Sequence, residues 1–292
     1  MRASDFLLFT FDLRGRLLRT MLMFCFVGPW CVLGGALAMF FGALKHQPGC
    51  RWVLKCWSGG LLSVAGVRLQ APSPPPLDAQ PCLFFSNHQS ALDIPILLQA
   101  CLPTHDVRFM AKESLFKIPV FGWGMRLSGF IPIRRHSARH SAEIFQEMLG
   151  TPGSTGIPAR DTTVPAGGTG VPAGGTGVPA RVSQQSPGSR SYIIFPEGTR
   201  SPDGRLQPFK KGAIGLALRM NLPIVPVTLI DACHANPKGR YLVRPGTVRV
   251  IFHEPLSVAA DSGRERRDAL AAQLFATICS ALPQDQQPQV KS

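Results

Sequence analysis

The segment Asn87-His-Gln-Ser-Ala-Leu-Asp93 contains a histidine and an aspartate five residues apart. A carboxylate bonded to one imidazole nitrogen fixes the tautomer and stabilises the imidazolium, which leaves the other nitrogen free as a general base. On one continuous helix the two side chains would diverge by about 140°, so pairing requires His88 in a loop and Asp93 at a helix start. On the spacing alone, a loop histidine beside a helix-capping aspartate is the simpler interpretation.

A second polar cluster, Phe195-Pro-Glu-Gly-Thr-Arg200, places Gly198 between a carboxylate and a guanidinium in a tight turn. Glycine lets backbone amides approach an anion closely, and Arg200 can bind a phosphate in a bidentate way. Lys210-Lys211 downstream and Arg134-Arg135 upstream add positive charge. The cluster therefore indicates an anion site, with a salt-bridged turn as the alternative.

Metal binding is not indicated by the remaining candidate ligands. The eight cysteines form no CxxC pair and no zinc-finger spacing, so we interpret them as reduced structural residues, which weakly favours a reducing compartment. No ligand-spaced motif joins the His88–Asp93 pair to the histidines at 105, 136, 140, 234 and 253. We expect no metal site.

Both polar clusters directly follow apolar segments that are typical of buried strands. We expect further strands and helices to alternate along the chain, which favours an α/β layer architecture in which ligands gather where strand ends meet loops. The expected strands are 67–70, 82–86, 107–111, 191–195, 224–229 and 247–252, and the expected helices are 93–101, 137–149, 212–220 and 264–282.

Residues 151–190 interrupt this pattern. The sequence VPAGGTG occurs at 164–170 and again at 171–177. A Gly/Pro-rich repeat buries too little apolar surface to offset the entropy of ordering, so we expect a disordered insertion. The predicted organisation is then a membrane-anchoring segment 1–60, a catalytic α/β domain 61–283 containing this insertion, and a polar tail 284–292.

The N-terminal region is apolar enough to meet a membrane. Residues 20–44 carry no formal charge and are long enough for a hydrocarbon core of about 30 Å, but Pro29-Trp30 and Gly34-Gly35 are expected to break a helix there. Basic residues flank both ends, and the positive-inside rule places both flanks in the cytoplasm. A helix–break–helix dipping into one leaflet satisfies this, with a single span and a cleaved signal peptide as alternatives.

The net charge and the composition of the chain limit the kinds of molecule that it is expected to bind. With 31 Lys+Arg against 17 Asp+Glu the net charge is +14, while only 16% of residues are charged and 45% are hydrophobic. This composition excludes a disordered chain and fits an anionic membrane surface, an acidic substrate or a nucleic acid. A nucleic acid is disfavoured because no basic stripe interleaved with aromatic residues is present.

Four segments, in this order, resemble the blocks of the phospholipid/glycerol acyltransferase family, specifically its 1-acylglycerol-3-phosphate acyltransferases. NHQSALD resembles the HX4D block, GFIPIRR the second block, FPEGTRS the third and LPIVPVT the proline-containing fourth; these are residues 87–93, 129–135, 195–201 and 222–228. The likeness covers roughly residues 80–256. It implies a glycerolipid acyltransferase-like sheet flanked by helices, with N-terminal membrane-anchoring helices.

The resemblance also implies roles for residues. His88 would be the general base and Asp93 its orienting partner, acting on the acceptor's own hydroxyl rather than through an acylated enzyme residue. The acceptor phosphate would bind Arg135, Glu197, Gly198, Thr199 and Arg200, with Glu197 holding an arginine in place. Family members often have Asp-Arg where this chain has Arg134-Arg135, which puts the acceptor specificity in doubt.

The implied reaction transfers an acyl chain from acyl-CoA or acyl-carrier protein to the sn-2 hydroxyl of lysophosphatidic acid, giving phosphatidic acid in phospholipid biosynthesis. It implies no metal or redox cofactor, and a place on the membrane bilayer, at the cytoplasmic face of the inner membrane. Two alternatives remain. One is a related acyltransferase for another lysolipid, such as a lyso-ornithine lipid, and the other is a catalytically silent membrane interaction protein.

Overall fold

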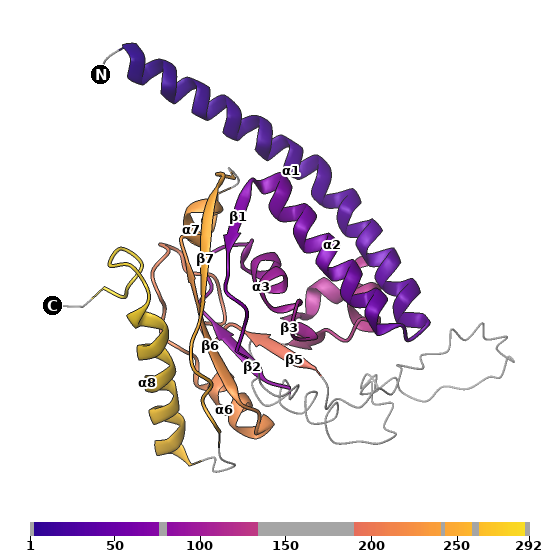
Figure 1. Cartoon of the computed structure of the whole chain (residues 1–292), viewed down its shortest axis with the longest axis vertical. Coiled ribbons are helices and arrows are strands. Elements are labelled where there is room, and N and C mark those ends of the chain that lie inside the picture. The colour runs from indigo at the N-terminus through magenta and orange to yellow at the C-terminus, as the bar shows by residue number, and fades with distance from the viewer. Residues whose placement is uncertain (1–2, 76–80, 134–189, 241–242, 259–262, 290–292) are drawn as a thin grey trace, which may run out of the picture.

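The computed structural model describes residues 3–75, 81–133, 190–240, 243–258 and 263–289 (Figure 1). Within them one mixed sheet has the strand order β1-β7-β6-β2-β5-β3-β4. The strands are β1 (Val67–Gln70), β2 (Leu83–Ser86), β3 (Val107–Lys112), β4 (Ile131–Ile133), β5 (Ser191–Ile194), β6 (Ile224–Ile230) and β7 (Gly246–Phe252). The helices are α1 (Ala3–Ala43), α2 (Gln47–Ala65), α3 (Asp93–Cys101), the 3-10 helix η1 (Glu113–Lys117), α4 (Phe121–Leu127), α6 (Lys211–Met220), α7 (Ala232–Ala235) and α8 (Arg264–Ser280).

The centre of the sheet is parallel. Strand β2 pairs in parallel with both β5 and β6, and β3 pairs in parallel with β5 and β4, whereas β7 runs antiparallel to β6. All residues of β2, β5 and β6 are buried, as expected for strands covered on both faces. The carboxyl ends of β2, β5 and β6 therefore meet at one side of the sheet, which we call the carboxyl edge.

Alternate residues of the central strands pack against helices on opposite faces of the sheet. Phe84 and Val225 belong to one core with Ile96 of α3 and Leu54 of α2. The neighbouring residues Leu83 and Phe85 point the other way and pack with Leu216 of α6 and Leu274 of α8. Figure 1 shows the same division, with α1, α2 and α3 on one side of the sheet and α6 and α8 on the other.

The predicted break inside the N-terminal apolar segment is wrong. Helix α1 continues through Pro29 and through Gly34-Gly35 and ends at Ala43. A proline removes one helix hydrogen bond, which a long helix tolerates. Gly35 does not weaken the helix but lets α4 approach it: a Cβ on Gly35 would lie 2.8 Å from the Cα of Phe121. The glycine pair therefore makes a helix–helix contact instead of a break.

The chain reverses direction just after α1. His46 caps α2 through its Nδ1, which accepts a hydrogen bond from the Gly49 nitrogen at 3.0 Å. Helix α2 then returns along α1, with Trp30 Nε1 donating to the Trp57 carbonyl at 2.9 Å. It runs to Ala65 and ends at Gly66, whose φ of 68° is left-handed. The boundary expected at residue 60 thus falls inside a helix.

Most other expected elements are confirmed to within two residues, and strand 67–70 and helix 93–101 have the predicted bounds. The predicted helix 137–149, the insertion 151–190 and Arg134-Arg135 lie outside the described residues. Within α1, Thr20–Ala43 is long and apolar enough to cross a membrane.

Candidate active site

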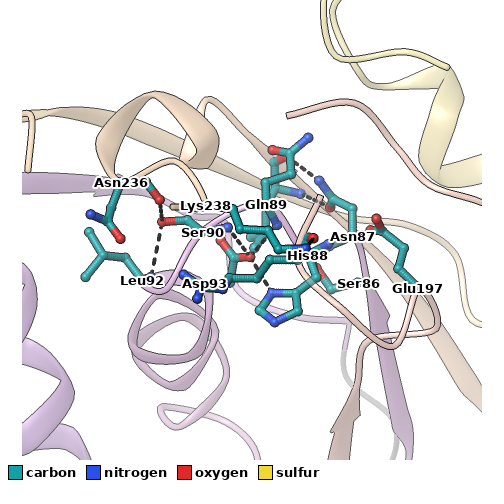
Figure 2. Close-up of polar contacts among 12 residues, drawn as sticks. Ser86, Asn87, His88, Gln89, Ser90, Leu92, Asp93, Glu197, Asn236 and Lys238 are labelled. Atoms are coloured by element: carbon teal, nitrogen blue, oxygen red, sulfur yellow. Dashed lines mark hydrogen bonds and ion pairs between the residues drawn. The ribbon is translucent and has the colours of Figure 1, made fainter. Parts of the chain in front are cut away.

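His88 and Asp93 meet at the carboxyl edge, as the family resemblance implied. His88 lies in the loop after β2, Asp93 is the first residue of α3, and His88 Nδ1 is 2.8 Å from Asp93 Oδ2 (Figure 2). The same Oδ2 accepts hydrogen bonds from the backbone nitrogens of Gln89 at 2.7 Å and Ser90 at 2.9 Å. The carboxylate is fully buried and acceptor-only, so Nδ1 of a neutral imidazole carries the proton and Nε2 keeps the lone pair.

The His88 ring lies flat against a second aromatic ring. Its centroid is 4.0 Å from that of Phe195, with an angle of 17° between the planes. Only 8% of His88 is exposed. The imidazole plane is therefore fixed by stacking on one face and by the Asp93 hydrogen bond at its edge.

The two motif loops are joined through the main chain of His88. Its nitrogen donates to Glu197 Oε1 at 2.6 Å, and its carbonyl accepts from the Ser201 nitrogen at 2.7 Å. The loops meet because β2 and β5 are neighbouring parallel strands, paired at Phe85 and Ile194. Both backbone groups of the histidine are thus held by the segment that follows β5.

Among the described residues, the Glu197 side chain forms hydrogen bonds only with backbone nitrogens. It is 2% exposed, and its Oε2 accepts from the Gln207 nitrogen at 3.1 Å while Oε1 binds the His88 nitrogen. Burial raises the pKa of this carboxyl to about 8, against the opposing effect of the two backbone N–H groups. We expected Glu197 to hold an arginine; its contacts among the described residues are two peptide nitrogens, and Arg135 lies outside those residues.

The first loop is also tied to β6 and to the segments beyond it. Asn87 Oδ1 accepts from the Leu229 nitrogen at 2.8 Å and its Nδ2 donates to the Leu229 carbonyl at 2.9 Å, so the side chain imitates one more strand residue. Gln89 Nε2 donates to the Gly204 carbonyl at 2.6 Å, and Ser90 Oγ to the Asn236 carbonyl at 3.1 Å. The loop that carries the histidine is consequently rigid.

The turn after β5 contains the other predicted residues. Gly198 has a φ of +70°, which favours glycine, and a Cβ there would lie 2.9 Å from the Lys210 side chain. Thr199 and Arg200 follow, half-buried. The remaining predicted phosphate ligand, Arg135, lies outside the described residues.

Three residues of this site were missed at the sequence level. Phe195 was assigned to the strand, Ser201 had no assigned role, and Lys238 was not considered. Lys238 Nζ lies 2.8 Å from the Arg200 carbonyl and 3.3 Å from Thr199 Oγ1 (Figure 2). Its only sequence signal is a Pro-Lys-Gly turn, which says nothing about a contact with residues 38 positions away.

Among the described residues, no three His, Cys, Asp or Glu side chains gather as metal ligands would. The eight cysteines, all described, form no disulfide, and burial raises the pKa of the Cys82 thiol to about 11.

Comparison with known proteins finds one family and many similar chains. A family model described as Acyltransferase matches residues 67–230. A chloroplastic 1-acyl-sn-glycerol-3-phosphate acyltransferase of Brassica napus is 33% identical over 182 residues, 62% of this chain and 42% of the relative. The Cocos nucifera enzyme of that name is 42% identical over 71% of this chain and 56% of its own length. This chain spans about half the length of such curated relatives.

Two bacterial proteins match over nearly their whole length. A 1-acyl-sn-glycerol-3-phosphate acyltransferase of Pseudomonas aeruginosa is 23% identical over 89% of this chain and 91% of its own. The crystal structure of PlsC, an LPA acyltransferase from Thermotoga maritima, superposes with a TM-score of 0.66 at 23% identity, covering 91% and 94% of the two chains. The likeness to the Thermotoga maritima structure shows a shared fold.

Proposed function

Because the chain belongs to the acyltransferase family, we propose that it transfers an acyl group from a thioester to the sn-2 hydroxyl of 1-acylglycerol-3-phosphate. The product is phosphatidic acid, and the donor is acyl-CoA or acyl-carrier protein. The observation that carries the proposal is the buried His88–Asp93 pair at the carboxyl edge. The names of the plant and bacterial relatives support the choice of acceptor.

The chemistry follows from the tautomer of His88. Nε2 takes the proton of the acceptor hydroxyl as that oxygen attacks the thioester carbonyl, and Asp93 stabilises the resulting imidazolium through Nδ1. The tetrahedral intermediate then collapses and expels the thiolate, which takes the proton back from Nε2. No residue of the enzyme is acylated, because the nucleophile is the acceptor oxygen itself.

We assign the acceptor phosphate to the turn after β5. The Gly198 conformation leaves room for close approach to the backbone, and Thr199 and Arg200 supply a hydroxyl and a guanidinium. Arg135 is proposed as the second guanidinium. Glu197 would act indirectly, by holding the backbone of His88 and of the turn at a fixed separation.

We further propose that the N-terminal helices hold the enzyme on a membrane, at its cytoplasmic face. Among the side chains whose burial the structure describes, the exposed large apolar ones all lie on the α1–α2 and η1–α4 side, and none of those described on α6 or α8 is among them; they are Leu17, Leu18, Met21, Leu22, Phe24, Val32, Leu33, Phe40, Leu44, Trp52, Ile118 and Trp123. The second half of α1 packs on α2 and α4, which favours insertion into one leaflet over an isolated span. The net charge of +14 favours an anionic surface.

The test is acyl transfer from acyl-CoA and acyl-carrier protein to lysophosphatidic acid by the full chain in membranes. His88→Ala should lower kcat by about 10²–10⁴-fold, since the general base is removed. His234→Ala is the matched control, because this histidine is exposed on α7 and, among the described residues, its ring faces Asp231 and Asp285 rather than either motif loop.

Activity that survives in His88→Ala would refute the assigned base. If the wild type does not acylate lysophosphatidic acid but acylates another lysolipid, such as a lyso-ornithine lipid, the proposed reaction stands and the proposed acceptor is wrong. A folded wild type inactive on every acceptor would favour the silent interaction protein.

A further inference from the structure

Lys238 lies where the two motif loops and the segment after α7 come together. Its ammonium donates to the Arg200 carbonyl at 2.8 Å and to Thr199 Oγ1 at 3.3 Å. The two preceding residues are bound to the histidine loop: the Asn236 carbonyl accepts from Ser90 Oγ, and Pro237 forms a bridge with Ser90. Figure 2 shows Lys238 beside this loop.

The charge of Lys238 is not offset by a carboxylate of the described residues. Both of its hydrogen-bond partners are neutral oxygens, which occupy two of the three N–H donors. The acidic groups near the turn have other partners. Asp93 binds His88, Glu197 binds two backbone nitrogens, and Asp203 accepts from Ser201 Oγ and the Arg205 nitrogen.

Two further cations surround the same turn. The Lys210 side chain lies against Gly198, and Arg200 is a half-buried residue with no ion pair among the described residues. Three positive charges for which the described residues supply no counter-charge favour a doubly charged anion over a neutral or singly charged one. Phosphate is the group in the proposed substrates that has this character.

We propose that Lys238 is a further phosphate-binding residue, whose ammonium contacts a phosphate of the bound substrate while fixing the Thr199–Arg200 turn. The inference deepens the proposed function and rests on it for the identity of the substrates. The phosphate belongs either to the acceptor or to a coenzyme A donor, each of which carries a phosphomonoester. The alternative role is a purely structural link between loops.

Three substitutions separate charge from structure. Lys238→Met removes charge and donors, Lys238→Gln keeps donors for the two oxygens but no charge, and Lys238→Arg keeps both. Arg240→Met is the matched control. It removes one positive charge from the same loop, at an exposed side chain for which the structure shows no contact, and retains the backbone hydrogen bonds of Arg240.

Binding is measured first, without turnover, on the full chain in detergent. The probes are 1-acyl-2-deoxyglycerol 3-phosphate, which lacks the attacking hydroxyl, its phosphate-free counterpart, and coenzyme A. Lys238→Met and Lys238→Gln should weaken a phosphate-bearing probe by about tenfold or more and leave the phosphate-free probe unchanged, since a charged hydrogen bond is lost. Lys238→Arg should restore most of the affinity.

Comparison of the probes also identifies which substrate supplies the phosphate. A loss confined to the deoxy-lysolipid, with a raised acceptor KM in the acyl-transfer assay, assigns the acceptor phosphate. A loss confined to coenzyme A, with a raised KM for acyl-CoA and an unchanged KM for acyl-pantetheine, assigns the donor phosphate.

Two results would overturn the proposal. One is unchanged affinity for both phosphate-bearing probes in Lys238→Met. The other is equal weakening of all probes with rescue by Lys238→Gln, which is the signature of a structural link. The wild type could fail to acylate lysophosphatidic acid while Lys238→Met still weakens binding of a phosphate-bearing probe. In that case the proposed acceptor is wrong and the role of Lys238 stands.

Discussion

The peptide nitrogen of His88 lies 2.6 Å from Glu197 Oε1, although the two residues are 109 positions apart in the chain. The other oxygen of Glu197 accepts from the Gln207 nitrogen. One buried carboxylate thus fixes the main chain of the proposed base and the main chain beyond the proposed phosphate turn. Any change in its protonation acts on both.

The first prediction concerns the pH dependence of stability. Burial raises the pKa of Glu197 from its usual 4.5 to about 8, so between these values the folded chain retains a proton that the unfolded chain has released. The contribution of Glu197 to the free energy of unfolding therefore falls as pH rises from about 5 to 8, and it is constant above pH 8. Each unit of difference between the folded and unfolded pKa corresponds to about 1.4 kcal/mol. Glu197→Gln should flatten this fall in unfolding experiments.

Glu265→Gln, at an exposed position in the first turn of α8, is the control and should leave the pH profile unchanged. A Glu197→Gln profile that still falls as steeply as wild type between pH 5 and 8 would show that another group is responsible.

The second prediction isolates the charge of Asp93. In Asp93→Asn the side-chain oxygen can still accept from His88 Nδ1 and from the two backbone nitrogens, while the new amide group replaces Oδ1, which has no partner among the described residues. The tautomer is kept and stabilisation of the imidazolium is lost. We expect kcat to fall by about 10²-fold or more with little change in acceptor KM.

Asp268→Asn, an exposed change on α8, controls for loss of a negative charge and should have wild-type kinetics. Full activity in a folded Asp93→Asn protein would mean that its negative charge has no part in the proton transfer.

The third prediction tests the contact of α1 with α4. In Gly35→Ala the new Cβ would meet backbone atoms of Phe121 at 2.8 to 3.0 Å, so the helices must separate, at a cost of about 1–3 kcal/mol. Gly28→Ala, with nothing within 4 Å of the new Cβ, should be neutral or stabilising. Thermal unfolding of both variants measures the difference, and equal midpoints would contradict the close approach.

The fourth prediction concerns the apolar face of α1. Replacing Phe24, Leu33 and Phe40 with glutamine should reduce the fraction of the chain that sediments with anionic vesicles, because these side chains are exposed and apolar. Activity on substrate presented in detergent should change little. The control set Phe24→Leu, Leu33→Met and Phe40→Leu keeps the apolar character, and equal sedimentation of both sets would exclude this face as the membrane contact.

The fifth prediction concerns the repeat. Deleting 153–187 leaves about twenty residues between β4 and β5, and a parallel crossover needs about a dozen. We expect activity and the unfolding midpoint to stay near wild type. A folded, membrane-bound deletion protein with a large loss of activity would assign the repeat a role in catalysis.

What could be predicted from the sequence was local in origin. The strand Val67–Gln70 and the helix Asp93–Cys101 were found with the right bounds, because apolar runs and turn residues mark such ends. The spacing allowed His88 to meet Asp93 through a loop followed by a helix start, and the family resemblance selected that arrangement. The stacking of Phe195 on His88 depends on the pairing of β2 with β5, which no local pattern encodes.

What the sequence did not predict has one physical cause. Gly34-Gly35 was interpreted as a helix break because glycine is a poor helix former in isolation, yet its lack of a side chain is what lets α4 approach. For Glu197 the expected arginine stays a prediction as far as Arg135 is concerned, since Arg135 lies outside the described residues; within them its oxygens bind peptide nitrogens of His88 and Gln207. In each case the residue type was informative and its partner was set by tertiary structure.

The pairing of Phe85 with Ile194 has a consequence for how this chain can vary. The separation of the two motifs is set by adjacent strands and not by the number of residues that join them. Tandem copies of VPAGGTG between the motifs can therefore be gained or lost, as short repeats in coding DNA commonly are, without moving His88 relative to Arg200. Chains of unequal length that carry the same site are the expected outcome.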